Sequence, residues 1–133
     1  MLIILDGIDG AGKTTQTELL VKRLKKEGRK ARVLDFPQYK QNFFGGMVKK
    51  FLNGDFGGID EVDPHLASLL YALDRWESSR AISRWLKSKA VVVMNRYSTA
   101  NMIHQSVKLP LKQRTNFIRW IETIGAATLG LSA

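Results

Sequence analysis

Cysteine is absent from the 133 residues of the chain. Its absence excludes disulfide bonds, thiolate metal sites and a cysteine nucleophile, and it is compatible with a reducing compartment. The apolar runs of the chain are short, and none approaches the roughly 20 residues of a membrane-spanning helix. No basic region precedes the first apolar run, Leu2–Leu5, as a secretory leader would require. We therefore expect a soluble cytoplasmic protein without a membrane partner.

Acidic residues are few, with 12 Asp and Glu against 21 Lys and Arg, and the formal net charge is +9. This surplus favours polyanionic partners, and the phosphates of a nucleotide would satisfy it. Much of the surplus lies between Lys22 and Arg32. The cations there either complement the negative end of a helix dipole or form a nucleic-acid patch. We prefer the solvated helix end and expect no nucleic-acid partner.

The segment Gly7–Thr15 reads GIDGAGKTT and matches the P-loop pattern G-x-x-x-x-G-K-[ST]. Its glycines allow backbone N–H groups to point at phosphate oxygens, and the helix that follows directs its positive dipole end at the same anion. Lys13 adds a mobile positive charge, and the Thr14 hydroxyl is suited to bind magnesium. The ATP- and phosphate-binding residues predicted from this motif are Gly7, Gly10, Ala11, Gly12, Lys13, Thr14 and Thr15.

Apolar periodicity predicts alternating strands and helices in a single domain spanning residues 1–133. Strands are expected at residues 2–5, 31–36 and 90–94, and the last of them is typical of a strand buried on both faces. Helices are expected from about Lys13 to Gly28, at residues 47–52, at 64–87 after an Asp63 cap, near Ser98 and from Pro110. This order indicates an α/β fold of three layers, the P-loop NTPase fold, in which helices flank a parallel sheet.

The long helix carries two side chains of interest, Tyr71 and Arg75. They lie four residues apart and therefore share a face, with Asp74 beside them. Spacing alone favours a partly buried packing residue for Tyr71 and an ion-paired surface charge for Arg75. The leucine stripe of the same helix, which includes Leu66 and Leu69, is suited to a core or to a dimer interface.

Five segments together resemble the thymidylate kinase family, whose members move a phosphoryl group from ATP to dTMP with Mg²⁺. They follow the family order over the whole chain, and they are the P-loop, Phe36-Pro37, Tyr71–Arg75, Arg96-Tyr97 and Leu129–Leu131. The resemblance implies ATP and dTMP as partners and magnesium as a cofactor. It also admits a homodimer, since family members are usually dimers.

The resemblance assigns roles that spacing alone does not. It implies catalytic roles for Asp9, which would lie by the acceptor sugar and the magnesium site, for Lys13, and for Arg96, which would hold the dTMP phosphate. Tyr71 would stack on thymine and Arg75 would hydrogen-bond the base, in preference to the packing interpretation above. The implied dTMP-binding residues are Asp9, Phe36, Tyr71, Arg75, Arg96, Asn101 and His104, and the implied metal-binding residues are Thr14, Asp9 and Asn95.

Three positions depart from the family pattern. Asn95 stands where the family commonly has an aspartate, so it offers an oxygen without a negative charge and magnesium binding should weaken. Gln38 stands where related members often carry an arginine that points toward the phosphates. His104 stands where an aromatic residue usually packs near the sugar, and we expect it neither to bind a metal nor to act as a base.

The carboxyl end is the largest departure. In the family, the segment that corresponds to Leu129–Leu131 is followed by further strands and by an arginine-bearing lid over ATP. The resemblance therefore implies a chain that lacks its C-terminal strands and lid. Because position 10 is glycine, the P-loop supplies no arginine of its own. We expect the complete form to phosphorylate dTMP to dTDP and the present chain to have little or no activity.

Two alternatives stay open at this point. One is another P-loop kinase acting on a (deoxy)nucleotide or a nucleoside. The other is a non-catalytic nucleotide- or nucleic-acid-binding module that uses the basic surface, and its support is Asn95 and the missing carboxyl-terminal part. Competition among pyrimidine nucleotides separates the first alternative from a dTMP kinase. A salt series identifies the second, because nucleic-acid binding weakens steeply with salt.

Overall fold

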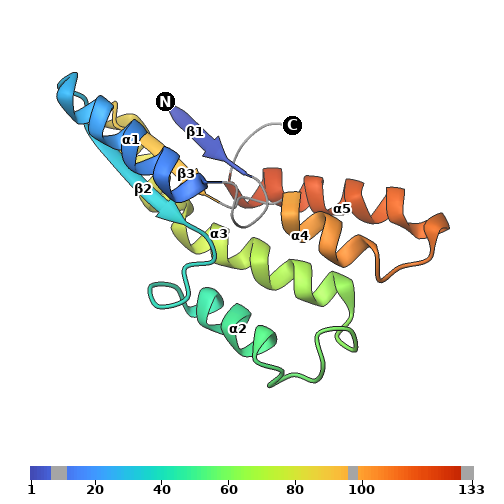
Figure 1. Ribbon diagram of the computed structural model, residues 1–133. Coiled ribbons are helices and arrows are strands. Elements are labelled where there is room, and N and C mark those ends of the chain that lie inside the picture. Colours follow the sequence, from blue (N-terminus) through green and yellow to red (C-terminus); the bar gives the residue numbers. More distant parts are fainter. Residues whose placement is uncertain (7–11, 96–98, 130–133) are drawn as a thin grey trace. The chain divides into compact units, whose positions relative to one another are not determined.

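The computed structural model describes residues 1–6, 12–95 and 99–129 (Figure 1). Contacts between residues divide the chain into two compact units. The first unit comprises residues 1–36 and 80–100, and the second comprises residues 37–79 and 101–133. Among the described helices, none is both long enough and apolar enough to cross a membrane.

The first unit is built on a parallel sheet of β1 (Leu2–Leu5), β2 (Ala31–Asp35) and β3 (Val91–Asn95). The strand order is β1-β3-β2, and both outer strands run parallel to β3. Leu5 and Asp35 are both paired with Asn95, so the three strands end at one edge of the sheet. The three predicted strands are confirmed to within one residue.

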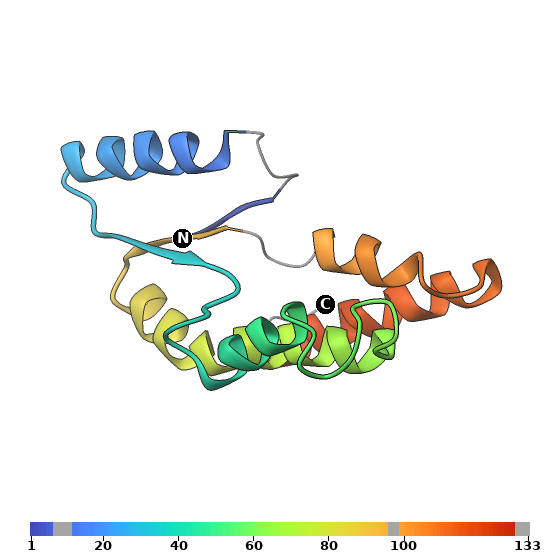
Figure 2. The ribbon, with the colours of Figure 1, turned by 60° about the horizontal axis from the view of Figure 1, so that its bottom comes forward.

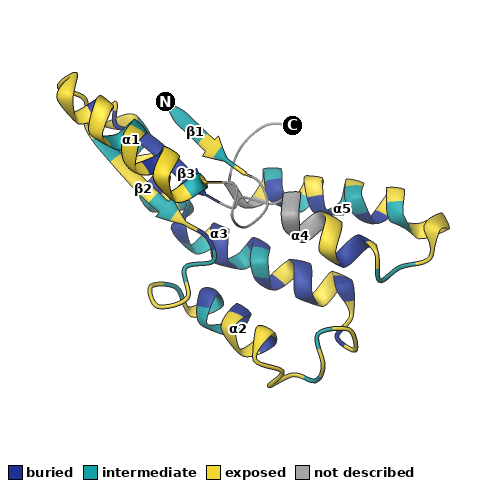
Figure 3. Cartoon of the chain, viewed as in Figure 1, coloured by how far each residue is buried: buried dark blue, intermediate teal, exposed yellow. Residues whose placement is uncertain are grey.

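Helices cover both faces of the sheet, as Figure 2 shows. Every residue of β3 is buried, which confirms the interpretation of its apolar run (Figure 3). Val91 and Val93 pack against Leu24 of α1 (Lys13–Lys26). Because side chains alternate along a strand, Val92 and Met94 face the other side. Residues 80–87 of α3 (Pro64–Lys87) cover that side (Figure 2), where Ile82 is buried and the Arg32 guanidinium lies 5.6 Å from the Trp85 ring centroid. The predicted three-layer α/β architecture is confirmed.

The second unit is helical. It contains α2 (Phe43–Leu52), most of α3 (Pro64–Lys87), most of α4 (Thr99–Ser106) and α5 (Leu111–Leu129). Its core joins α2 to α3 and consists of Val48, Phe51, Val62, Ala67 and Leu70. The aromatic rings of α5 contact the start of α3, where the His65 ring centroid lies 5.0 Å from that of Phe117 and 4.8 Å from that of Trp120.

The predicted bounds of α3 are confirmed, and so is its cap. Asp63 Oδ1 accepts hydrogen bonds from the amides of His65 at 2.8 Å and Leu66 at 3.3 Å. The predicted start of α2 at residue 47 is wrong, because the helix begins at Phe43. The leucine stripe is only partly buried: Leu70 is 8% exposed, whereas Leu66 is 51% and Leu69 37% exposed. The buried face of α3 instead includes Ala67, Ser68 and Ala72.

Candidate nucleotide-binding site

The amino-terminal end of α1 is opened by Gly12. Its dihedrals, φ 82° and ψ 17°, are left-handed, and residues with a side chain rarely adopt them. The Gly12 carbonyl oxygen accepts a hydrogen bond from the Gln16 amide at 3.0 Å, and no side-chain hydrogen bond caps the helix. The first-turn amides of such a helix have no partner within it and form a binding site for anions. Lys13 is half-buried, and Thr14 and Thr15 are exposed. Gly7, Asp9, Gly10 and Ala11 lie outside the described residues.

Asn95 connects the end of β3 to α1. The Thr17 hydroxyl lies 3.0 Å from Asn95 Oδ1 and 2.7 Å from the Lys13 carbonyl oxygen. Both side chains are buried, with Asn95 8% exposed and Thr17 6% exposed. The hydroxyl carries one proton for these two acceptors, and the amide oxygen of Asn95 has a second lone pair. The contact with Thr17 joins the start of α1 to the end of β3, and it leaves a lone pair of the Asn95 oxygen for a metal ion. A magnesium-binding role for Asn95 stays a prediction.

Phe36 follows β2 and is 2% exposed. Its amide donates to the Asn95 carbonyl oxygen at 3.1 Å, which extends the pairing of β2 with β3 by one hydrogen bond. The first unit thus brings Phe36, Asn95 and Thr17 together near the strand ends. A role for Phe36 in lining a nucleotide pocket stays a prediction.

Tyr71 lies on α3 and is half-buried. Its ring meets that of Phe51 edge to face, with 6.5 Å between the centroids and 82° between the planes. Burial raises the pKa of the Tyr71 phenol to about 12, and the charges that Tyr39 and Asp74 would carry add to the rise. The phenol is therefore neutral at physiological pH, which suits a ring surface that stacks on an uncharged base.

Arg75 and Asp74 are both buried, at 2% and 1% exposure. The interpretation of Arg75 as a surface charge is therefore wrong, because this part of α3 buries polar as well as apolar side chains. Burial raises the pKa of the Asp74 carboxyl, while hydrogen bonds from Asn42 and Gln38 and the charge of Arg75 oppose the rise. Burying a guanidinium and a carboxyl costs desolvation free energy, and the charge of Arg75 offsets part of that cost for Asp74.

A network that sequence reasoning missed surrounds Asp74. We call it the α3 clamp, and it consists of Asn42, Asp74, Glu77 and Ser78. Asp74 Oδ2 accepts from the Gln38 amide at 3.0 Å, and Asn42 Nδ2 lies 2.9 Å from Asp74 Oδ1, 2.8 Å from the Asp74 carbonyl oxygen and 3.0 Å from Ser78 Oγ. Glu77 accepts from the amides of Phe43 at 2.9 Å and Phe44 at 2.5 Å. The clamp therefore fixes residues 38–44 to α3.

The remaining predicted residues follow β3. Arg96 and Tyr97, like the side chain of Asn101, lie outside the described residues. His104 is on α4 and is exposed. Neighbouring Gln105 is 1% exposed, and its Oε1 has no hydrogen-bond partner.

The described side chains are suited to bind magnesium only together with the phosphates of a bound nucleotide. Among the described residues, no group of three or more His, Asp and Glu side chains could hold a metal ion. Magnesium does not need such a group, because it is usually held by one or two protein oxygens together with substrate phosphates and water. Thr14 and Asn95 are oxygen donors of this kind, so the residues fit a metal that arrives with a nucleotide.

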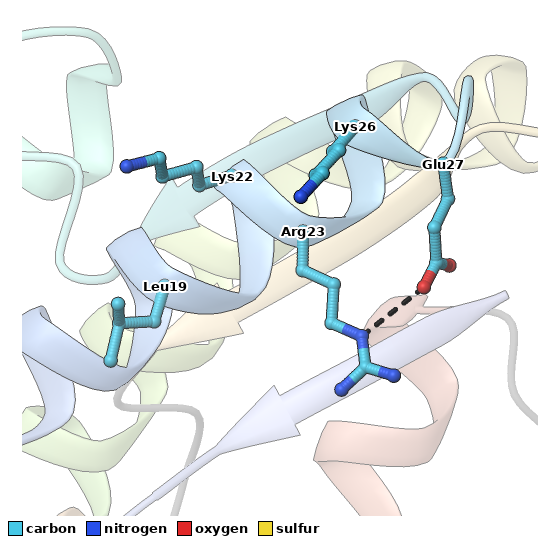
Figure 4. A pocket seen from close by; sticks show the side chains of 5 residues that line it. All are labelled: Leu19, Lys22, Arg23, Lys26 and Glu27. Carbon is cyan, nitrogen blue, oxygen red and sulfur yellow. Dashed lines mark hydrogen bonds and ion pairs between the residues drawn. The ribbon is translucent and has the colours of Figure 1, made fainter.

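A hollow of about 550 Å³ lies on α1, away from its amino-terminal end (Figure 4). It is lined by Leu19, Lys22, Arg23, Lys26 and Glu27, and Arg23 Nε lies 3.1 Å from Glu27 Oε1. All five residues are exposed, as expected of a solvated helix end. Three of the five are basic residues near the end of α1, where positive charge complements the helix dipole.

A family model described as thymidylate kinase matches residues 5–121. The chain belongs to the thymidylate kinase family. Among curated relatives of this thymidylate kinase family member, the thymidylate kinase of Mycobacterium tuberculosis is 30% identical over 131 residues, covering 98% of the chain and 61% of the relative. The human thymidylate kinase is 31% identical over 107 residues, covering 80% of the chain and 48% of the relative.

The fold agrees with this assignment. The structure of thymidylate kinase from Candida albicans superposes with a TM-score of 0.74 at 24% identity, covering 92% of the chain and 56% of that protein. The chain spans about half to three-fifths of the length of these relatives. The family match and the superposition thus establish the family and the fold of the chain.

Proposed function

We propose that this chain carries the phosphate-binding and acceptor-binding parts of an enzyme that transfers the γ-phosphoryl group of ATP to dTMP, giving dTDP. The observation that carries the proposal is the family match over residues 5–121, which begins at the end of β1 and includes the left-handed Gly12 at the head of α1. A helix start of this form, with Lys13 directly after the glycine, suits the phosphates of a nucleoside triphosphate.

The acceptor side rests on the residues of α3. Tyr71 offers a neutral ring, and Arg75 is a buried cation one helical turn later. We propose that the ring stacks on thymine and that the guanidinium donates to a carbonyl oxygen of the base. We also propose dTMP-binding roles for Phe36, Asn101 and His104. Arg75 would then discriminate against cytosine, whose amino group is a donor where thymine has an acceptor.

Transfer requires two anionic groups to be brought together and their charge to be neutralised as it moves. We propose that Lys13 and Arg96 supply positive charge at the phosphates and that Asp9 lies by the acceptor sugar. Magnesium, held by Thr14, Asp9 and Asn95 together with the phosphates, would add charge neutralisation when bound. For the complete protein we propose ATP as the phosphoryl donor, magnesium as the metal ion and a homodimer as the assembly.

Calorimetric titration of the purified chain with dTMP, dUMP, dCMP and thymidine tests the acceptor proposal. We expect dTMP to bind more tightly than the others and dCMP to bind weakly or not at all. Equal affinity for dCMP and dTMP would contradict the role of Arg75. A parallel titration with ATP and magnesium tests the P-loop, and a kinase assay on the same sample tests transfer, for which we expect little or no turnover.

A further inference from the structure

The segment between β2 and α2 is bonded to α3 at both of its ends. Near its start, the Gln38 amide donates to Asp74 Oδ2 at 3.0 Å. At its end, the amides of Phe43 and Phe44 donate to the two carboxylate oxygens of Glu77. These donors and acceptors are 33 to 36 positions apart in the chain. Hydrogen bonds to α3 therefore hold residues 38–44 at both ends.

The start of α2 depends on α3 for its cap. Asn42 is the N-cap residue, but its side chain makes no capping hydrogen bond. It is used instead on the Asp74 carbonyl oxygen, 2.8 Å away. Glu77 takes over the cap, because a carboxylate at a helix start accepts amide protons and also interacts favourably with the dipole. A charged side chain from α3 thus caps the start of α2.

The packing leaves no room for the segment to shift toward α3. A Cβ atom added at Gly45 would lie 2.0 Å from the Gln38 carbonyl oxygen and 2.9 Å from Asp74 Oδ1. Both distances are shorter than real Cβ contacts, the first by about 1 Å and the second only slightly. The backbone of α2 is therefore pressed against the same carboxylate that holds Gln38.

The clamp lies next to the proposed base-binding residues. Asp74 directly precedes Arg75 and interacts with it electrostatically, and it also affects the phenol of Tyr71. Tyr39, which belongs to the clamped segment, acts on the same Tyr71 phenol. Movement of residues 38–44 would therefore change the surroundings of the ring that is proposed to stack on thymine.

We propose that Asn42, Asp74 and Glu77 are positioning residues of the acceptor pocket, which hold residues 38–44 as a fixed wall beside Tyr71 and Arg75. This inference rests on the proposed function. It extends the proposal from the residues that touch the nucleotide to those that keep the pocket in its binding form. A wall that is already in place avoids an ordering cost when dTMP binds.

Glu77 gives the sharpest test, because it is only half-buried and its removal need not unfold the core. In Glu77→Ala we expect exchange of the Phe43 and Phe44 amides to accelerate about fivefold to tenfold, the size of a lost helix cap. The dissociation constant for dTMP should rise about threefold or more, since fewer molecules keep the binding form. Affinity for ATP, which is proposed to bind at the P-loop, should not change.

Two further variants serve as controls. Glu77→Gln keeps one carbonyl oxygen that accepts an amide proton, so we expect it to recover part of the dTMP affinity. Glu122→Ala removes an exposed carboxylate from α5 and should leave both affinities unchanged. The probes are dTMP and ATP, titrated into each full chain, and amide exchange is followed residue by residue by NMR.

The outcomes separate the two claims. If wild type binds dTMP and Glu77→Ala exchanges faster at Phe43 and Phe44 without losing dTMP affinity, the positioning role is refuted and the proposed function stands. If affinity for dTMP and ATP falls equally, the effect is general and the positioning role is also refuted. If wild type fails to bind dTMP, both claims fall.

Discussion

The two binding regions proposed for this protein are built in opposite ways. At the head of α1, the important groups are backbone amides that follow Gly12, and neighbouring residues in the chain determine their geometry. On α3, the important groups are side chains such as Asp74 and Glu77, whose hydrogen-bond partners lie more than 30 positions away in the chain. A local motif can be recognised in a sequence, whereas a network of this kind becomes visible only in the fold.

The largest effect is expected at the head of α1. Lys13→Met should lower the affinity for ATP about tenfold to a hundredfold, because a charge-assisted hydrogen bond to phosphate contributes roughly 1.5–3 kcal/mol. Affinity for dTMP should change far less. The control is Lys22→Met, which removes an exposed charge from the same helix. Calorimetric titration with ATP measures the affinity of both variants. An equal loss of ATP affinity in the two would show that α1 acts only through its overall positive charge.

Two adjacent glycines test the close packing of α2 on the α3 clamp. Gly45→Ala should lower the free energy of unfolding by about 1–3 kcal/mol, because its Cβ would lie 2.0 Å from the Gln38 carbonyl oxygen. Gly46→Ala meets its nearest atom at 3.8 Å and should raise stability by up to about 1 kcal/mol, through helix propensity. Urea unfolding measures both. Equal effects of the two substitutions would mean that α2 does not press on the clamp.

Asn95→Asp tests the neutral residue at the end of β3. A carboxylate there can still accept the Thr17 hydroxyl, which lies 3.0 Å away, and it adds the negative charge that magnesium prefers. We expect the magnesium dependence of ATP binding to shift several-fold toward lower metal concentration. A magnesium titration at fixed ATP measures the shift. An unchanged titration would remove Asn95 from the proposed metal-binding residues.

Asp74 should make stability depend on pH in the acidic range. Its pKa is raised in the folded protein, chiefly by burial. Between the ordinary pKa of an aspartate and this raised value, the folded state retains a proton that the unfolded chain has lost. The stability contributed by Asp74 is therefore complete below the ordinary pKa and is lost as pH rises through the raised value.

The comparison with Asp74→Asn isolates this effect, since asparagine does not titrate. The difference in unfolding free energy between wild type and the variant should decline as pH rises through the acidic range and then become constant. Urea unfolding at a series of pH values measures it. A difference that grows with pH would show that hydrogen bonds from Asn42 and Gln38 outweigh burial.

The smallest effect is expected at the exposed end of α1. Arg23 and Glu27 form an ion pair of 3.1 Å, but their side chains are 80% and 52% exposed. Such pairs contribute about 0.5 kcal/mol or less. Arg23→Gln should therefore leave urea unfolding and both nucleotide affinities nearly unchanged. The contradicting result would be that wild type binds oligonucleotides in a salt-sensitive way and that Arg23→Gln abolishes this binding. The exposed end of α1 would then be a nucleic-acid surface.

Much of the fold could be predicted from local patterns. The bounds of α3 and its Asp63 cap are confirmed because helix periodicity and capping act over a few residues. The buried strand β3 is confirmed because an unbroken apolar run has few alternatives. The start of α2 was predicted wrongly because its cap is Glu77, 33 positions later. The predicted exposure of Arg75 was wrong for a related reason, since the spacing of residues within one helix does not show which of them the rest of the fold buries.

The candidate site divides in the same way. Gly12 and Lys13 belong to a motif of fixed spacing, and the structure shows the left-handed glycine that the motif requires. Asn42, Glu77 and Ser78 carry no motif. Asn42 before a helix suggests an ordinary N-cap, but in the fold its amide is directed at Asp74 and Ser78. Such positions follow from tertiary packing, so sequence reasoning could not have found them.

Amide hydrogen exchange of the chain with and without each nucleotide tests the account most directly. We predict that dTMP protects the amides of Gln38, Phe43 and Phe44, whereas ATP with magnesium protects the first turn of α1 after Gly12. Protection by both nucleotides confined to residues 19–27, the exposed basic end of α1, would contradict the account.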